Sequence, residues 1–424
     1  MSRPRLVCAA CGTILSVSLP ATECACGGLL DVQRETGVRG RALRARFDRR
    51  VGKDPRGQGS GVWRFRELVL ETAGPIVSHP EGNTPLRRRE TVTRYAGLSD
   101  LMLKHEGENP TGSFKDRGMT VAVTQAVRTG ATGVACASTG NTSASMAAYA
   151  AQAGLPALVL VPAGKIAAGK LAQALAYGAR TLLVRGDFDA CLRLAREASR
   201  ELGITLLNSI NPWRLEGQKT VMLEMLQQLG WEPPDWVVVP AGALGNTSAF
   251  GKALVEARAL GLIGRVPRLA SIQASGAAPF FRGYETGFRR RFVVQAETVA
   301  TAIRIGDPAS WDRAVRAIRG TRGVVAAVSD REILEAKAVI DGAGIGCEPA
   351  SATTVAGIRR LVRADVIRPG QSVVAVLTGH LLKDPDVVID YHLRGRGPRA
   401  NRPIEIEPRL AAVEAVLRKH RGRR

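Results

Sequence analysis

The chain has 424 residues, of which 45 % are hydrophobic, and a formal net charge of +22 at pH 7. This length is enough for two or more domains with substantial cores, and no uninterrupted apolar stretch is long enough to span a membrane. The positive excess is arginine spread along the chain, and aromatic residues make up only 4 %, so stacking platforms for single-stranded nucleic acid are scarce. We therefore expect neither a nucleic-acid nor a membrane partner. Because the N-terminus lacks the hydrophobic segment of a secretory signal, we expect a cytoplasmic location.

Four of the seven cysteines lie near the N-terminus, at Cys8, Cys11, Cys24 and Cys26. They form the pattern C-x2-C-x12-C-x-C, with a glycine directly after each pair. Two cysteine pairs on tight turns can close a tetrahedral thiolate shell around zinc. The one-residue gap of the second pair strains simultaneous ligation, so a metal-free knuckle is the alternative. We predict a structural zinc-ribbon-like segment over residues 1–38, with these cysteines as ligands and no catalytic role.

A lysine follows a turn-rich stretch in the segment 109–119, Asn-Pro-Thr-Gly-Ser-Phe-Lys-Asp-Arg-Gly-Met. Asn109, Pro110 and Gly112 break the backbone, and the run from Phe114 onward carries apolar residues at helical spacing. Lys115 should therefore lie in the first turn of a helix. The positive end of the helix dipole disfavours an ammonium there, which favours the neutral amine that forms Schiff bases. A lone lysine of this kind is more often a solvated charge, so the residues that follow decide its role.

Short apolar strands alternate with helices from residue 133 onward. We expect strands at 133–137, 157–161, 180–184, 204–207, 237–240, 269–273, 323–328 and 372–377, and helices at 146–153, 167–177, 187–202 and 248–260. This alternation is typical of parallel sheets covered on both faces. We predict an α/β fold with two doubly wound parallel-sheet domains and a site between them. The large domain would comprise residues 39–105 and 210–385, the small one 106–209, and residues 386–424 a basic extension with a helix.

Three loops follow strands in this scheme, and in such sheets ligands bind beyond the carboxyl ends of the strands. The glycine-rich loop 242–248 precedes a helix and fits a phosphate, but it matches neither a P-loop nor the dinucleotide fingerprint. The polar loop 138–145 suits a carboxylate or a ring hydroxyl, and 378–380 closes the last strand. A lysine able to form a Schiff base, together with a phosphate cradle that is not a nucleotide motif, indicates pyridoxal phosphate.

Long, ordered motifs lie at residues 109–119, 137–142, 208–220, 347–351 and 377–380. Together they resemble the threonine synthase family, within the tryptophan-synthase-β-like group of pyridoxal-phosphate enzymes. The resemblance runs from about Glu81 to Asp384, and some members share the cysteine-bearing N-terminus. It implies a carbon–oxygen lyase that converts O-phospho-L-homoserine and water to L-threonine and phosphate.

The resemblance also implies roles for individual residues. Lys115 would hold the cofactor as a Schiff base and transfer protons, Asn141 would bind the 3′-hydroxyl of the ring, and Thr378 would face the pyridine nitrogen. A hydroxyl at that nitrogen does not enforce a charged pyridinium. The cofactor phosphate would be met by Gly242, Ala243, Leu244, Gly245 and Asn246, the substrate phosphate by Asn208, Ser209 and Arg214, and the substrate carboxylate by Ser138, Thr139 and Thr142.

Two positions depart from the family pattern. The family's phosphate loop usually reads Gly-Asn-x-Gly-Asn, and its first asparagine also reaches the substrate phosphate, whereas Ala243 offers only its backbone there. Leu381 stands where the family tends to have glycine. Losing one neutral donor costs about 1 kcal/mol, which either weakens binding or marks a changed substrate.

Three alternatives to threonine synthesis follow from these departures and from the cysteine segment. The first is β- or γ-replacement on another phosphorylated amino acid, such as phosphoserine. The second is dehydration of threonine or serine, and the third is a zinc-ribbon binding protein on an inactive enzyme fold. In every case we expect a homodimer.

Overall fold

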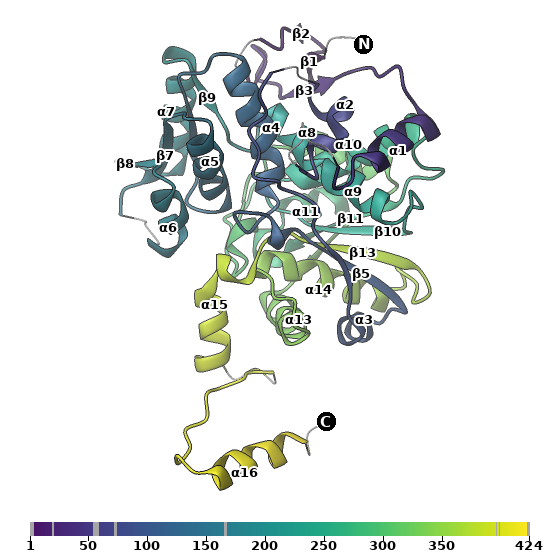
Figure 1. The fold of residues 1–424 in the computed structure, drawn as a ribbon, viewed down its shortest axis with the longest axis vertical. Coiled ribbons are helices and arrows are strands. Elements are labelled where there is room, and N and C mark those ends of the chain that lie inside the picture. Colours follow the sequence, from purple (N-terminus) through teal and green to yellow (C-terminus); the bar gives the residue numbers. More distant parts are fainter. Residues whose placement is uncertain are drawn as a thin grey trace. The chain divides into compact units, whose positions relative to one another are not determined.

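The computed structural model describes residues 4–18, 21–53, 59–71, 74–164, 168–395, 397 and 399–421. The chain divides into two compact units, residues 1–384 and 385–424. The first unit contains two parallel sheets and one small antiparallel sheet (Figure 1). The second contains the short helix α15 (Pro385–Ile389) and the helix α16 (Leu410–Arg421), the latter close to where the sequence predicts a C-terminal helix.

The larger sheet has six strands in the order β12-β11-β10-β13-β5-β4. The strands are β4 (Leu86–Arg88), β5 (Asp100–His105), β10 (Trp236–Pro240), β11 (Arg268–Ala274), β12 (Val324–Val328) and β13 (Ser372–Leu377). All neighbours are parallel except β4, which pairs antiparallel with β5 at the edge. The inner strands are buried along almost their whole length and are mostly apolar, because helices cover both faces of the sheet.

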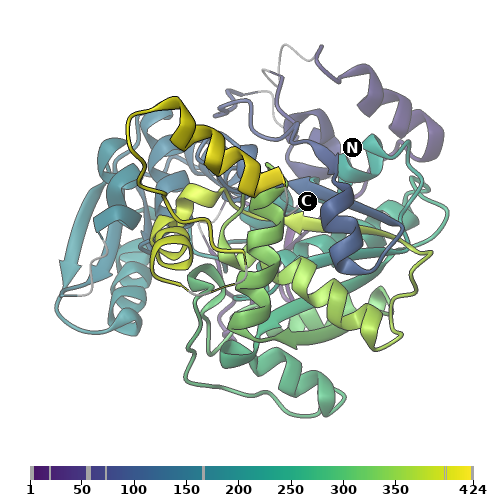
Figure 2. The same cartoon turned by 90° about the horizontal axis from the view of Figure 1, so that it is seen from below.

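Helices lie on the two faces of this sheet. One face carries α3 (Glu90–Ala96), α13 (Asp330–Gly342) and α14 (Pro349–Arg363), which stand in front of the sheet when the molecule is seen from below (Figure 2). The other carries α8 (Pro212–Gln218), α9 (Thr220–Gln228) and α10 (Gly245–Ala259). The first unit also contains α1 (Gly40–Arg49), α2 (Arg66–Val69), α11 (Pro279–Glu285) and α12 (Trp311–Gly320).

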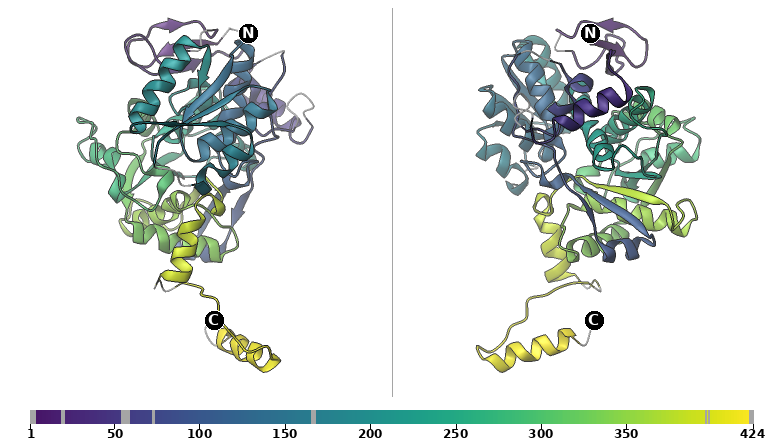
Figure 3. Two further views of the ribbon diagram at one scale, coloured as in Figure 1. Left: turned by 90° about the vertical axis from the view of Figure 1, so that its left-hand side faces the viewer. Right: turned by 45° about the vertical axis from the view of Figure 1, so that its right-hand side comes forward.

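The smaller sheet has four parallel strands in the order β8-β7-β6-β9, and it faces the viewer in the left panel of Figure 3. The strands are β6 (Gly133–Ala137), β7 (Ala157–Pro162), β8 (Arg180–Val184) and β9 (Ile204–Leu206), and the helices around them α4 (Lys115–Arg128), α5 (Asn141–Gln152), α6 (Ala168–Ala176) and α7 (Phe188–Glu201). Along β6, Val134 and Cys136 join the core beneath α4 and α5, while Ala135 and Ala137 join the core beneath α7. Alternate residues of β6 point to opposite faces of the sheet, so the two clusters show that helices cover both faces.

The predicted fold class is confirmed, with two parallel sheets and helices on both faces of each. Strands β6, β8 and β13 have the predicted bounds, and the other predicted strands differ by one or two residues. The polar loop predicted at 138–145 is wrong beyond residue 140, because α5 begins at Asn141 and the small residues that follow continue the helix. The same happens at α10, which begins at Gly245 instead of Ser248. The domain boundaries within residues 39–385 stay a prediction.

The N-terminal segment forms an antiparallel sheet of β1 (Arg5–Cys8), β2 (Ile14–Leu15) and β3 (Leu30–Gln33). It packs on the helices that cover the larger sheet, since Arg313 Nε lies 2.8 Å from Asp31 Oδ1 and Lys252 Nζ donates to the Val32 carbonyl at 2.6 Å. In the described part of the chain we find no helix with the length and apolar character needed to cross a membrane.

Candidate functional site

A cavity of about 880 Å³ lies between loops that belong to the two parallel sheets. Its walls come from 107–115 before and at the start of α4, 137–144 after β6, 240–246 after β10, 301–305, and 378–384 after β13. Three of these segments follow the carboxyl ends of parallel strands, where ligands bind in such sheets. The volume suits a small molecule.

The structure brings almost all predicted site residues to this cavity. Those that line it are Lys115, Ser138, Thr139, Asn141, Thr142, Asn208, Ser209, Gly242, Ala243, Leu244, Gly245, Asn246 and Thr378. Arg214 is not among the described residues that line it, although its charge acts on Lys115. Residues that are far apart in the sequence therefore meet at one site, as the three-loop interpretation requires.

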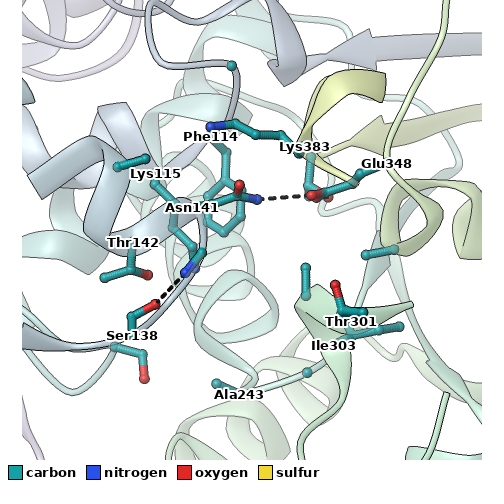
Figure 4. Close-up of a pocket in the computed structure, with 18 of the residues that line it drawn as sticks. Phe114, Lys115, Ser138, Asn141, Thr142, Ala243, Thr301, Ile303, Glu348 and Lys383 are labelled. Carbon is teal, nitrogen blue, oxygen red and sulfur yellow. Dashed lines mark hydrogen bonds between the residues drawn. The ribbon is translucent and has the colours of Figure 1, made fainter. Parts of the chain in front are cut away.

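Lys115 is the first residue of α4, as predicted. Its side chain is half-buried, and its Nζ lies 4.4 Å from the centre of the Phe114 ring (Figure 4). No described residue accepts a hydrogen bond from Nζ or forms an ion pair with it. Burial, reinforced by the positive charge of Arg214, lowers the pKa of Lys115 to about 7, against a smaller opposing effect of Glu348. The amine is therefore available in its neutral, nucleophilic form near neutral pH.

The residues on either side of Lys115 hold the start of α4 in place. The Asp116 carboxylate accepts hydrogen bonds from the Thr111 backbone N–H at 2.7 Å and from the Thr111 and Ser145 hydroxyls at 2.6 Å. Burial raises the pKa of Asp116 to about 6. Arg117, also fully buried, pairs with the carboxylates of Glu106 and Glu224. The motif around Lys115 thus contains two buried anchors in addition to the amine.

The loop between β10 and α10 presents backbone N–H groups to the cavity. Leu244 has φ 65°, and α10 begins directly after it at Gly245. A Cβ at Gly242 would lie 2.8 Å from Ile303 Cα, so a larger residue would not fit without a shift. Asn246 Oδ1 is buried and has no hydrogen-bond partner within the described ranges. The first turn of a 15-residue helix with unpaired N–H groups favours an anion.

The polar loop after β6 is held by Asn208. Its amide accepts from the Ala137 N–H and donates to the Ala137 carbonyl, both at 3.0 Å. The Ser138 hydroxyl accepts from Gly140 N–H at 3.3 Å (Figure 4). The Asn208 side-chain amide is therefore used in hydrogen bonds to the end of β6. Ser138, Thr139 and Thr142 line the open cavity near the start of α5.

Glu348 and Lys383 also line the cavity, although the sequence analysis assigned them no role. Glu348 precedes α14 and accepts from Asn141 Nδ2 at 2.9 Å and from the Thr378 hydroxyl at 3.1 Å (Figure 4). Lys383, after β13, donates to the Gln173 side chain of α6 and so connects the segments around the two sheets. Glu348 could have been noticed in the sequence, because it lies in one of the family motifs, directly before a proline that begins a helix.

Comparison with known proteins agrees with this geometry. A family model described as pyridoxal-phosphate dependent enzyme matches residues 77–379. The chain belongs to this family. Within it, the curated relatives are threonine synthases: that of Methanocaldococcus jannaschii is 42 % identical over 417 residues, covering 97 % of this chain and 98 % of the relative. That of Mycobacterium tuberculosis is 48 % identical over 338 residues, covering 79 % and 89 %.

Solved structures of the family share the fold. The chain matches threonine synthase from Escherichia coli with a TM-score of 0.66 and 21 % identity, covering 98 % of this chain and all of the other. It matches maize serine racemase with a TM-score of 0.62 and 20 % identity, covering 81 % and 93 %. The predicted threonine synthase resemblance is confirmed by the curated relatives, while these structural matches concern the fold alone.

Arg214 of α8 is completely buried, and only part of its guanidinium group is hydrogen-bonded. Its Nη1 donates to the Leu207 carbonyl at 2.9 Å, but Nε and Nη2 have no hydrogen-bond partner among the residues the structure describes. Burial lowers the pKa of Arg214 to about 10. Its predicted contact with a substrate phosphate stays a prediction. Burying two donor atoms without hydrogen-bond partners lowers the free energy of unfolding unless an anion binds to them.

The four N-terminal cysteines converge, despite the short second gap. Their sulfur atoms all lie within 4.8 Å of one another, with separations of 3.4 Å for Cys11–Cys26 and 3.7 Å for Cys11–Cys24. A tetrahedral zinc site with Zn–S bonds of about 2.3 Å requires sulfur separations of roughly 3.8 Å. The neighbouring Thr13 hydroxyl lowers the pKa of the Cys11 thiol to about 6. The cluster fits a zinc ion, well separated from the cavity in the small antiparallel sheet.

Proposed function

We propose that this chain converts O-phospho-L-homoserine and water to L-threonine and phosphate. The observation that carries the proposal is the sequence identity of 42–45 % to curated threonine synthases over more than nine-tenths of the chain. A lysine with a lowered pKa lies in the same cavity as a helix start that favours an anion, which supports it. The fold and the cavity alone would suit many family members, so the substrate rests on the relatives and on the residues that would contact it.

The residues of the cavity fit pyridoxal phosphate. Within the described residues, the Lys115 amine has no hydrogen-bond partner, and the loop 242–246 offers backbone N–H groups for the phosphate. Asn246 Oδ1 is buried and also has no hydrogen-bond partner there, so it could bind a ligand. Asn141 and Thr378 would lie at the ring. When bound, this cofactor withdraws electrons from the carbons that react.

Lys115 is the group that moves protons in this reaction. With its pKa lowered to about 7, its Nζ can accept the proton of the substrate Cα near neutral pH and then transfer protons at Cβ. Phosphate leaves from Cγ and water adds at Cβ. Phe114, Ala243 and Ile303 also line the cavity around these groups (Figure 4).

The two charged ends of the substrate would bind to different groups of the cavity. The N-terminus of α5, with Ser138, Thr139 and Thr142, would bind the carboxylate. Ser209, which lines the cavity, would contact the phosphate, and the positive charge of the buried Arg214 would attract it. Asn208 would act mainly by holding the loop, because its amide is already engaged.

A direct assay tests the substrate. Purified protein is incubated with O-phosphohomoserine, O-phosphoserine, threonine or serine, and phosphate, threonine and keto-acid products are measured. We expect phosphate and threonine from O-phosphohomoserine only, and no turnover by Lys115→Ala. Consumption of phosphoserine or threonine instead would contradict the proposal and favour one of the two enzyme alternatives.

The departure at Ala243 provides a sharper version of this assay. If the alanine merely weakens binding of the substrate phosphate, Ala243→Asn should lower KM for O-phosphohomoserine by about fivefold, corresponding to one neutral hydrogen bond of about 1 kcal/mol. A rise in KM, or a gain with phosphoserine only, would indicate that the alanine belongs to a different substrate.

We also propose that Cys8, Cys11, Cys24 and Cys26 bind one structural zinc ion. Metal analysis of the purified protein should find one zinc per chain, and Cys11→Ser with Cys24→Ser should lose it without altering the cavity. Zinc-free wild-type protein of full stability would contradict this. The homodimer and the cytoplasmic location remain predictions, which sedimentation and localisation experiments can check.

A further inference from the structure

The carboxyl group of Glu348 lies beside the two residues expected to meet the cofactor ring. It is buried, accepts from Asn141 through Oε2 and meets the Thr378 hydroxyl through Oε1. It also rests against the backbone, because a Cβ at Gly379 would come within 2.5 Å of its Cδ. The carboxyl therefore has a defined position, and glycine is required opposite it.

The direction of the hydrogen bonds next to Glu348 follows from counting protons. Ser351 Oγ accepts from the backbone N–H groups of Thr378 at 2.8 Å and Gly379 at 3.1 Å. A hydroxyl has two acceptor positions and one proton. Since both acceptor positions of Ser351 are used, its proton must go to the remaining neighbour, Thr378 Oγ1, at 3.0 Å. Thr378 thus always accepts from Ser351.

Thr378 is left with one proton and one acceptor position, to be divided between Glu348 and the cavity. If Glu348 is ionised, the Thr378 proton goes to the carboxylate, and Thr378 presents an acceptor to the cavity. If Glu348 is protonated, it donates to Thr378, and the Thr378 proton then points to the cavity. The first arrangement suits a ring nitrogen that carries a proton, and the second suits one that does not.

We propose that Glu348 and the ring nitrogen of the bound cofactor share one proton through the Thr378 hydroxyl. In the transfer, the N–H bond breaks as Thr378 Oγ1 takes that proton, and the proton of Thr378 moves to Glu348 Oε1, so that charge and atoms balance. Glu348 is then a positioning residue that sets the electron-withdrawing strength of the ring. This inference rests on the proposed function, since it takes the ring to lie between Asn141 and Thr378.

The surroundings of Glu348 leave both sites open to the proton. Burial raises the pKa of Glu348, while its hydrogen bonds with Asn141 and Thr378 and the charges of Lys383 and Lys115 oppose that effect. Its place directly before the 15-residue helix α14 also favours the carboxylate. Neither form is therefore strongly excluded, which is the condition for a shared proton.

The test uses holoenzyme loaded with pyridoxal phosphate that carries ¹⁵N in the ring. The ¹⁵N shift separates protonated from neutral ring nitrogen, with both limits recorded on the free cofactor. In Glu348→Gln the side-chain oxygen should face Asn141 Nδ2 and its amide should donate to Thr378, which mimics protonated Glu348. We expect the wild-type ¹⁵N signal to be displaced from the neutral limit toward the protonated limit. The signal of Glu348→Gln should lie at the neutral limit. Glu108→Gln, outside the cavity, should match the wild type.

Two further measurements test the inference, and the first of them needs no variant, so it serves even if Glu348→Gln does not fold. A wild-type signal at the neutral limit from about pH 6 to 9 would overturn it without any variant. In Thr378→Val, which cuts the path, Glu348→Gln should cause no additional shift, and an undiminished shift there would also overturn it. Phosphate release from O-phosphohomoserine is assayed in parallel. If the wild type releases phosphate but its ¹⁵N signal stays at the neutral limit, only the shared proton is refuted. If the ¹⁵N signal behaves as expected but no phosphate is released, only the proposed substrate is refuted.

Discussion

Two arginines, both completely buried, differ in what surrounds them. Arg117 of α4 is paired with the carboxylates of Glu106 and Glu224, at 2.6 and 2.7 Å, and these charges raise its pKa. Arg214 of α8 donates one hydrogen bond to a carbonyl, has two donors without a partner in the described structure, and has a lowered pKa. A buried charge with all its partners stabilises the fold, whereas one that lacks them is maintained at a cost and points to a ligand.

The same contrast occurs within three residues of α4. Arg117 faces the cluster of Lys104, Glu106 and Glu224, while Lys115 faces the cavity without a carboxylate partner. Burial lowers the pKa of Lys115 to about 7 because nearby charges do not compensate it. The helix therefore has one side that anchors it and one that carries the reactive amine.

Breaking the paired side should have the largest effect. Glu224→Gln leaves Arg64, Lys104 and Arg117 buried together without their shared carboxylate. We expect a loss of about 3–5 kcal/mol in the free energy of unfolding, measured by urea denaturation. The control Glu90→Gln breaks an exposed ion pair with Arg94 and should cost no more than about 1 kcal/mol. Equal losses in both variants would show that the buried cluster contributes nothing special.

Removing the unpaired arginine should have the opposite effect on stability. Arg214→Met deletes a buried charge that lacks partners, so the free energy of unfolding should stay the same or rise. KM for O-phosphohomoserine should rise by roughly 10- to 100-fold, as expected for the loss of a charged hydrogen bond of about 1.5–3 kcal/mol. A marked loss of stability with unchanged KM would assign Arg214 to the fold instead of the substrate.

The smallest effect, per pH unit, concerns Lys115 in cofactor-free protein. Below pH 7 both folded and unfolded chains bind its proton, so the full cost of burying an ammonium is present. Between pH 7 and the ordinary value of 10.5 only the unfolded chain binds it, and the free energy of unfolding should rise with pH. The slope from one proton is at most ~1.4 kcal/mol per pH unit. Lys115→Met should remove this contribution, and an unchanged slope would contradict the lowered pKa.

Prediction from sequence succeeded where the signal is local. The alternation of apolar runs and helices predicted the strands from residue 133 onward, because hydrophobic periodicity and turn residues act within a few positions, but β4 and β5 of the larger sheet were not predicted. Lys115 at a helix start was predicted for the same reason. The starts of α5 and α10 were placed too late, because Asn141 and Gly245 are typical of loops and are helical here only in the context of the sheet.

By itself, the sequence determined the two parallel sheets, the lysine at a helix start, the glycine-rich loop before a helix and the grouping of four cysteines, since each depends on residues close together in the chain. Only the tertiary structure decided which buried charges have partners. Glu348 meets Asn141 across 207 positions and Lys383 meets Gln173 across 210, while Arg214 is not among the residues that line the cavity. These relations follow from the strand order, in which β13 lies between β10 and β5, and a strand's neighbours cannot be read from its own residues.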